Sequence, residues 1–137
     1  MNPLLSTKPY SQLTELAFLA LRITLGLLML THGWPKLETL LSGDPIRFAD
    51  PIGIGKTASL ILTVFAEFFC SALLVLGLLT RIAAIPLIIT MIVAVFVVHG
   101  GDPIGKRELG LLYLFGYVAI FAHGSGPYSF DRLLGRK

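Results

Sequence analysis

Charged residues are scarce in this chain of 137 residues, because only 14% of the positions are charged whereas 55% are hydrophobic. This number of charges is too small to cover the surface of a water-soluble domain. The composition therefore excludes an ordinary soluble enzyme and predicts an integral membrane protein. The formal net charge of +3 is small, and the basic residues lie in loops and tails beside apolar segments. This distribution favours contact with membrane lipid and argues against nucleic-acid binding.

Cysteine is nearly absent too, since Cys70 is the single one. One thiol cannot form an intrachain disulfide or a Cys-x-x-Cys pair, so dithiol redox chemistry within the chain is excluded. The sequence also lacks a dinucleotide-binding fingerprint and a closely spaced set of metal ligands. We expect no metal or haem, and any electrons would have to come from a partner.

Long hydrophobic runs dominate what is present. Four segments read as membrane spans, at about residues 13–30, 57–79, 82–98 and 109–122. A spanning helix needs about 20 residues, so the last segment must borrow flanking residues. Only Thr80 and Arg81 join the second and third segments, which predicts a helical hairpin that turns at Arg81. We expect one all-α domain over residues 1–137, a membrane-embedded four-helix bundle.

The segment from His32 to Lys56 separates the first two predicted spans. Its prolines and glycines predict a break in the first helix and a structured or re-entrant loop. With four spans both termini lie on one side of the membrane, and Lys and Arg divide evenly between the two sides. Because acidic residues accompany the basic ones on the loop side, we expect the termini in the cytoplasm.

Two opposite charges lie near the middle of predicted spans, Arg22 in the first and Glu67 in the second. A charge at the bilayer centre costs about 2.5–3.5 kcal/mol on insertion scales, so it usually faces a partner or a polar cavity. The two residues have opposite sign and similar depth. We therefore expect a buried pair that sets helix register, with a polar cavity as the alternative.

Four polar residues emerge together on the side opposite the termini: His32, Lys36, His99 and Glu108. A quinone needs hydrogen-bond donors for its carbonyl oxygens and a proton route to the surface, and these side chains can supply both. Two alternatives stay open for the histidines. They cap or anchor helix ends, or they bind a metal or haem.

A short pattern occurs twice. His-Gly at residues 32–33 is followed by Asp-Pro-Ile-Gly at 50–53, and His-Gly at 99–100 is followed by Asp-Pro-Ile-Gly at 102–105. The same order in both halves suggests two related helix pairs, as in transporters built from internal repeats. A small transporter of a polar solute is therefore one alternative function.

Several short motifs together point to a known family. Arg22-x-x-x-Gly26 and His32-Gly33-x-x-Lys36-Leu37 precede Glu67 and Leu76-Gly77-Leu78-Leu79-Thr80-Arg81-Ile82-Ala83-Ala84. Met91, Ala94 and His99 follow, then Glu108 with Leu112-Tyr113, and finally Gly124-x-Gly126-Pro127-Tyr128-Ser129-x-Asp131. This combination, over about residues 21–134, resembles the DoxX family of small bacterial membrane proteins.

The resemblance implies a four-helix subunit of the bacterial cytoplasmic (inner) membrane. It implies quinone-linked electron transfer, as in a thiosulfate:quinone oxidoreductase or an oxidative-stress complex, with quinone as cofactor and a soluble or second protein subunit as partner. By position it carries over Arg22, His32, Lys36, Glu67, Arg81, His99 and Glu108 as the polar residues of interest. The alternatives are a non-catalytic scaffold for such a complex and the transporter. A homo-oligomer is also plausible on these grounds, because a lone four-helix bundle buries little protein surface.

Overall fold

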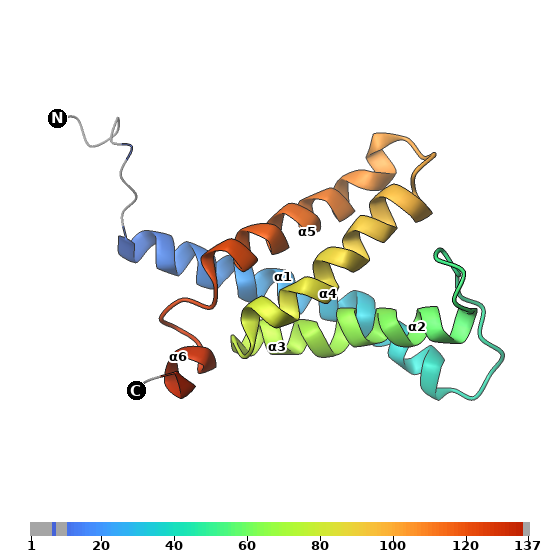
Figure 1. Ribbon diagram of the computed structural model, residues 1–137, viewed down its shortest axis with the longest axis horizontal. Coiled ribbons are helices and arrows are strands. Elements are labelled where there is room, and N and C mark those ends of the chain that lie inside the picture. The colour runs from blue at the N-terminus through green and yellow to red at the C-terminus, as the bar shows by residue number, and fades with distance from the viewer. Residues whose placement is uncertain (1–6, 8–10, 136–137) are drawn as a thin grey trace.

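The chain folds into antiparallel helices, shown by a computed structural model that describes residue 7 and residues 11–135. The first helix is α1 (Ser11–Leu41), and the second stretch joins α2 (Lys56–Val64), η2 (Phe65–Cys70) and α3 (Ser71–Leu76). The third joins α4 (Thr80–Ile92) and η3 (Val93–Val98), followed by α5 (Ile104–His123) and the short α6 (Phe130–Leu134). Both ends of the described chain lie at the same end of the bundle (Figure 1). Lys8, Arg136 and Lys137, which entered the count of basic residues, lie outside the described residues.

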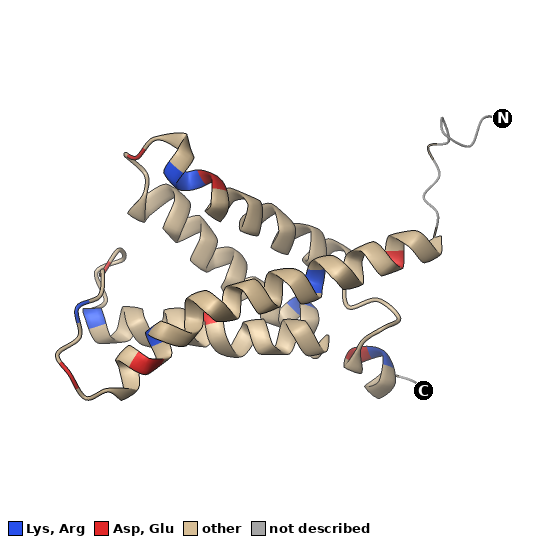
Figure 2. Cartoon of the chain, turned by 180° about the vertical axis from the view of Figure 1, so that it is seen from behind, with Lys and Arg blue, Asp and Glu red and all other residues tan. Residues whose placement is uncertain are grey.

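Three helical stretches of the described chain are long and apolar enough to cross a membrane: Ser11–Leu41, Lys56–Leu76 and Thr80–Val98. The fourth, α5, is less apolar because its first turns carry Lys106, Arg107 and Glu108. It extends the predicted segment at both ends to 20 residues. Most other charged residues lie in loops and near helix ends, whereas Arg22 and Glu67 lie within helical stretches (Figure 2). The predicted all-α, multi-pass membrane fold is confirmed.

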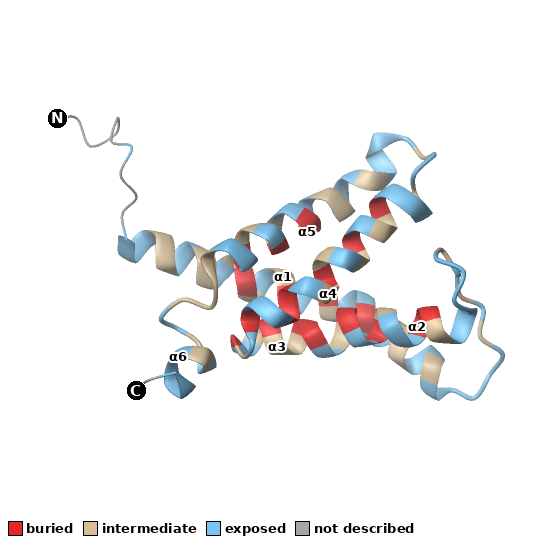
Figure 3. Cartoon of the chain, viewed as in Figure 1, coloured by how far each residue is buried: buried red, intermediate tan, exposed pale blue. Residues whose placement is uncertain are grey.

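The burial pattern suits a surface that faces lipid. Large apolar side chains such as Leu27, Phe69, Ile89 and Phe115 remain exposed, while the buried residues lie where the helices meet (Figure 3). In water an apolar surface of this extent would drive aggregation, whereas acyl chains can cover it in a bilayer.

The core joins all four helical stretches. Met29, Leu74, Leu87 and Tyr117 belong to one buried cluster, and each comes from a different stretch. Gly33 brings α1 against the second stretch, because a Cβ atom there would lie 2.7 Å from the carbonyl carbon and oxygen of Glu67. Small residues that let two backbones approach are typical of helix packing in membranes.

The first helix does not end near residue 30, as the sequence predicts. It continues through Gly33 and Pro35 to Leu41 and has 31 residues, a length of about 46 Å at 1.5 Å per residue. The loop to α2 is therefore confined to residues 42–55. Proline removes a helix hydrogen bond, but the packing of Gly33 and an ion pair of Lys36 hold the added turns. The prediction of a break at His32 was wrong because tertiary contacts outweigh local propensity.

The hairpin turn also differs from the prediction. The second stretch ends at Leu76, and residues 77–79 form the turn with positive φ at Gly77 (69°) and Leu79 (50°). Because α4 begins at Thr80, Arg81 lies in its first turn and not in the connection. Its guanidinium donates through Nε to the carbonyl oxygen of Phe121 (3.0 Å) and through Nη2 to that of Ala122 (3.3 Å). Arg81 thus binds the C-terminal end of α5.

Candidate functional site

Arg22 and Glu67 are both buried, with 3% and 5% of their surface exposed, but they do not pair with each other. The carboxylate of Glu67, in η2, forms an ion pair with the ammonium of Lys36, in α1. Lys36 lies in the turns by which α1 exceeds its predicted length, and those turns carry it to Glu67. The predicted Arg22–Glu67 pair is therefore wrong, whereas the predicted burial of both charges is confirmed.

Arg22 instead fastens the C-terminal segment to the bundle. Its guanidinium donates through Nη1 to the carbonyl oxygen of Ser125 and through Nη2 to that of Tyr128 (2.8 Å). The carboxylate of Asp131 accepts hydrogen bonds from the backbone N–H groups of Leu79 (2.7 Å) and Thr80 (3.0 Å). These contacts connect α1, the hairpin turn and α6, so the role of Arg22 is structural.

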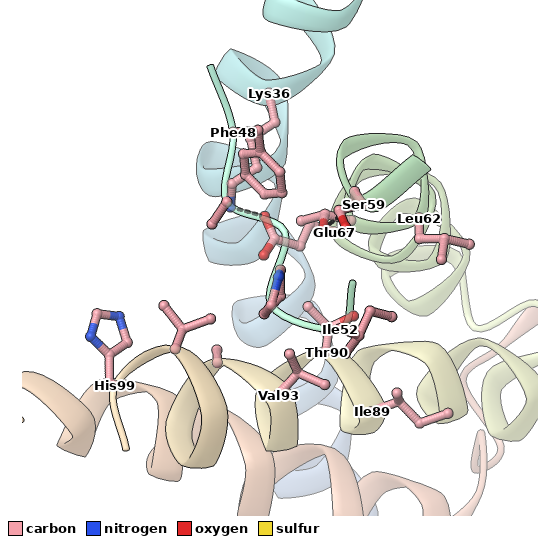
Figure 4. A pocket seen from close by; sticks show the side chains of 15 residues that line it. Lys36, Phe48, Ile52, Ser59, Leu62, Glu67, Ile89, Thr90, Val93 and His99 are labelled. Carbon is pink, nitrogen blue, oxygen red and sulfur yellow. Dashed lines mark hydrogen bonds and ion pairs between the residues drawn. The ribbon is translucent and has the colours of Figure 1, made fainter. Parts of the chain in front are cut away.

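The Lys36–Glu67 ion pair lies in the wall of a cavity of about 300 Å³, which we call the first cavity. Its other walls are the loop around Phe48 and Ile52 and the α4–η3 stretch around Thr90 (Figure 4). His99 lies at its edge. Most of the lining, including the whole contribution of the loop, is apolar, and the few polar side chains come from the first three helical stretches and from His99 directly after η3. Such a lining is typical of sites for small amphipathic ligands.

A second cavity of about 240 Å³ adjoins the first. The two share Lys36, Glu67, Ala94 and His99 in their walls. The second cavity extends towards the start of α5, where Lys106 and Arg107 line it. The ion pair thus lies between an apolar chamber and a more basic one.

Two π-helical segments border these cavities. Glu67 lies within η2, and η3 ends immediately before His99. A π-helical segment widens the helix and displaces side chains from regular α-helical positions, and such segments occur frequently at functional sites. Both segments occur where the second and third stretches face the cavities, which strengthens this region as the candidate site.

The structure brings together three of the four predicted ligand-binding residues. Lys36 and His99 line both cavities, and His32 lines the second one, with its ring edge-on to Tyr113 at 6.1 Å between centroids. Glu108 is exposed and lines neither cavity, so it lies apart from the group. Arg81 belongs to the opposite end of the bundle.

Sequence reasoning missed the partner of His99. Nδ1 of His99 lies 2.7 Å from Oδ2 of Asp102, three residues later. A carboxylate at that position orients the ring. The spacing His-x-x-Asp was the available signal. Ser59 and Thr90, which also line the first cavity, left no comparable trace in the sequence.

Asp50 holds the loop that covers the first cavity. Its carboxylate accepts hydrogen bonds from the N–H groups of Gly55 (2.9 Å) and Ile54 (3.0 Å) and from the hydroxyl of Ser59 (2.9 Å). These bonds, chiefly the one from Gly55, hold the pKa of Asp50 below its ordinary value. The repeated Asp-Pro-Ile-Gly pattern therefore has two different local roles, since Asp102 pairs with His99.

No group of three or more His, Cys, Asp or Glu side chains within the described part of the chain could hold a metal ion. The polar groups of the site are an ammonium, a carboxylate, hydroxyls and imidazoles. Such groups recognise a ligand through hydrogen bonds and charge.

Comparison with known proteins assigns the chain to a family. The family model of DoxX matches residues 17–100, from within α1 to just past His99. The chain belongs to the DoxX family. The matched part of this DoxX protein contains Arg22, Lys36, Glu67 and His99, and so the residues shared by both cavities.

A curated relative agrees with the family assignment. This DoxX protein is 31% identical over 134 residues to the uncharacterized membrane protein Rv3486 of Mycobacterium tuberculosis, and the match covers 87% of this chain and 82% of the relative. No solved structure matches the chain.

Proposed function

We propose that this DoxX protein is the membrane subunit of a quinone-linked oxidoreductase and that a quinone headgroup binds in the first cavity. The observation that supports this proposal is an apolar cavity with an ammonium, a carboxylate and an imidazole in its wall. Ligand pockets measure about 300–1,000 Å³, so a cavity of this size suits a single substituted ring. The exposed apolar faces of the surrounding helices give a lipid-soluble carrier a route from the bilayer.

The donor set fits both oxidation states of such a carrier. The ammonium of Lys36 has three N–H donors, and its bond to Glu67 leaves others for a carbonyl oxygen. With Asp102 at Nδ1, His99 keeps Nε2 as an acceptor when neutral and as a donor when protonated. Carbonyl oxygens need donors, whereas hydroxyl groups need acceptors such as Glu67. A bound quinone would supply the two-electron chemistry, and this chain would position it and exchange protons.

Electron delivery falls to a partner protein in this proposal. The sequence has a single cysteine and no dinucleotide-binding fingerprint. A soluble or second membrane subunit would therefore carry the donor site, and the DoxX chain would connect that subunit to the quinone pool of the bacterial inner membrane.

A binding experiment tests the proposal through Trp34, the single tryptophan, two residues before Lys36 on α1. Decylubiquinone is titrated into the protein in lipid nanodiscs while the tryptophan fluorescence is followed. Saturable quenching is expected for the native chain. Ala94 lies in the wall shared by both cavities, so the larger side chain of Ala94→Phe should fill the cavities and abolish saturable quenching. Val97 lies on the exposed face of the same segment, so Val97→Phe should retain saturable quenching.

The same titration separates the proposal from the scaffold alternative. Linear quenching that is equal in the native chain and in both variants would show partition into lipid alone and would contradict a quinone site. Native mass spectrometry of the protein released from its own membranes would also detect any partner chains that stay bound. Partners that remain bound without any quinone would favour a non-catalytic scaffold.

A further inference from the structure

A groove lies at the end of the bundle opposite the two cavities, and the proposed function does not use it. It has a volume of about 790 Å³ and is lined by the first turns of α1 and α4, the last turn of α5 and the segment that leads into α6. The closing Gly124-to-Asp131 motif forms part of it. Helices begin and end at this level, which places the groove where lipid headgroups meet the protein (Figure 1). We call it the C-terminal groove.

Two glycines build the wall of the C-terminal groove. Gly124 and Gly126 have φ values of 85° and 71°, which L side chains rarely adopt. A Cβ atom on Gly124 would lie 3.2 Å from Nη2 of Arg81, and one on Gly126 would lie 3.0 Å from Oε2 of Glu15. The glycines therefore let the chain pass close to two charged side chains without covering them.

The acidic groups of the groove are already engaged within the protein. Asp131 accepts hydrogen bonds from two backbone N–H groups at the start of α4. Glu15 lies 3.2 Å from Nε2 of His123, and the carbonyl oxygen of Gly124 lies 3.2 Å from Nδ1 of the same ring. Both carboxylates of the groove thus have partners within the protein.

The basic groups, by contrast, have donors to spare. Arg81 uses Nε and Nη2 to bind the end of α5, which leaves Nη1. Arg132 is exposed. Among the described residues, neither arginine forms an ion pair with a carboxylate. The groove therefore presents a surplus of positive N–H donors, which suits a phosphate group.

An apolar rim adjoins these donors. Leu79 and Ile82 line the groove while 52% and 64% of their surfaces remain exposed. A phospholipid places its phosphate and its acyl chains in the same relation. Free phosphate would use the arginines alone, and a soluble acidic peptide would leave the rim uncovered.

We propose that the C-terminal groove binds the headgroup of an anionic phospholipid, with the phosphate on Arg132 and Arg81 and the acyl chains along Ile82 and Leu79. The lipid fastens α6 and the hairpin turn to the membrane surface. This site is separate from the first cavity, so a lipid bound here leaves the quinone site open.

Native mass spectrometry of delipidated protein in mild detergent tests this site, with phosphatidylglycerol and phosphatidylcholine added in turn. We expect one tightly held phosphatidylglycerol and weaker phosphatidylcholine. Arg132→Gln should weaken phosphatidylglycerol binding about fivefold, as expected for the loss of one basic residue near an anionic headgroup. Arg47→Gln removes another exposed arginine, from the loop at the other end of the bundle, and should leave binding unchanged.

Three results would overturn the inference: equal binding by the Arg132 and Arg47 variants, equal binding of the two lipids, or full displacement of the lipid by millimolar inorganic phosphate. Ile82→Ser tests the contribution of the apolar rim, because it should weaken lipid binding without a change in charge. Decylubiquinone quenching of Trp34 should stay saturable in the Arg132 variant, so a failure of this inference is distinct from a failure of the proposed quinone site.

Discussion

The stability lost when Lys36 is replaced should be recovered in part when its ion-pair partner, Glu67, is replaced as well. Glu67 is almost fully buried, and its ion-pair partner is the ammonium of Lys36. Lys36→Met leaves the carboxylate buried without a compensating charge. The further change Glu67→Gln removes that charge, so the double variant should be more stable than the single Lys36 variant, although it lacks more native groups.

The expected magnitudes follow from the burial of the two side chains. Loss of one partner of a buried ion pair costs about 3–5 kcal/mol. The Lys36 side chain is 30% exposed, so water reaches the site and we expect about 3 kcal/mol, the lower limit of that range. Glu67→Gln keeps an amide oxygen that accepts from Lys36 and should cost about 1–2 kcal/mol. The double variant should recover about 1–2 kcal/mol of the single loss.

Unfolding by SDS in mixed micelles, followed by circular dichroism, measures these free energies. A second cycle with Arg22→Met provides the control, because Arg22 donates to backbone carbonyls and not to Glu67. Glu67→Gln should not rescue that variant. The reasoning is refuted if the Lys36 double variant unfolds as early as the single variant, or if Glu67→Gln rescues Arg22→Met.

Two further stability predictions use the same assay. Gly33→Ala should lower the free energy of unfolding by about 1–3 kcal/mol, because the added Cβ atom would lie 2.7 Å from the backbone of Glu67. Gly105→Ala is the control and should not lower the stability, because a Cβ atom there has nothing within 4 Å. Equal losses of stability in the two variants would contradict close packing of α1 on η2. Although burial raises it, hydrogen bonds from the N–H groups of Thr80 and Leu79 hold the pKa of Asp131 below its ordinary value of 3.8. Because the carboxyl group has a lower pKa in the folded state than in the unfolded state, it stabilises the folded protein at a pH above the unfolded-state pKa. This stabilisation is lost as the pH falls through the folded-state pKa. Asp131→Asn should therefore be less stable than the native chain at about pH 7 and approach it below pH 3.8; a gap that is constant with pH would contradict a role for the carboxylate charge.

The C-terminal segment has a clear part in the architecture. Arg22 and Asp131 lie more than a hundred residues apart in the sequence, and each fastens the chain that follows α5 at a different place: Arg22 binds it to α1, and Asp131 binds it to the hairpin between the second and third stretches. A charge within the apolar part of α1 is thereby satisfied by backbone carbonyls. Arg22 is thus a fastening residue, whereas Lys36 lines both cavities.

The sequence by itself determined the helical class, the number of helical stretches and the membrane environment. Long apolar runs with few charges have no other stable arrangement, because a bilayer requires every backbone group to be bonded within a helix or a closed barrel. The burial of Arg22 and Glu67 could be predicted for a similar reason, since a charge inside an apolar span must be satisfied by protein. These conclusions depend on local composition, which is read directly from the chain.

Only the tertiary structure decided which groups meet. Lys36 reaches Glu67 because Gly33 packs α1 against η2 and the helix continues past Pro35, a result of contacts between residues about thirty positions apart. The same long-range packing excludes Glu108 from the cavities and gives His99 its place beside the ion pair. Local propensity favoured a break where the helix continues, because the free energy of packing between distant segments exceeds the local cost of keeping Pro35 within a helix.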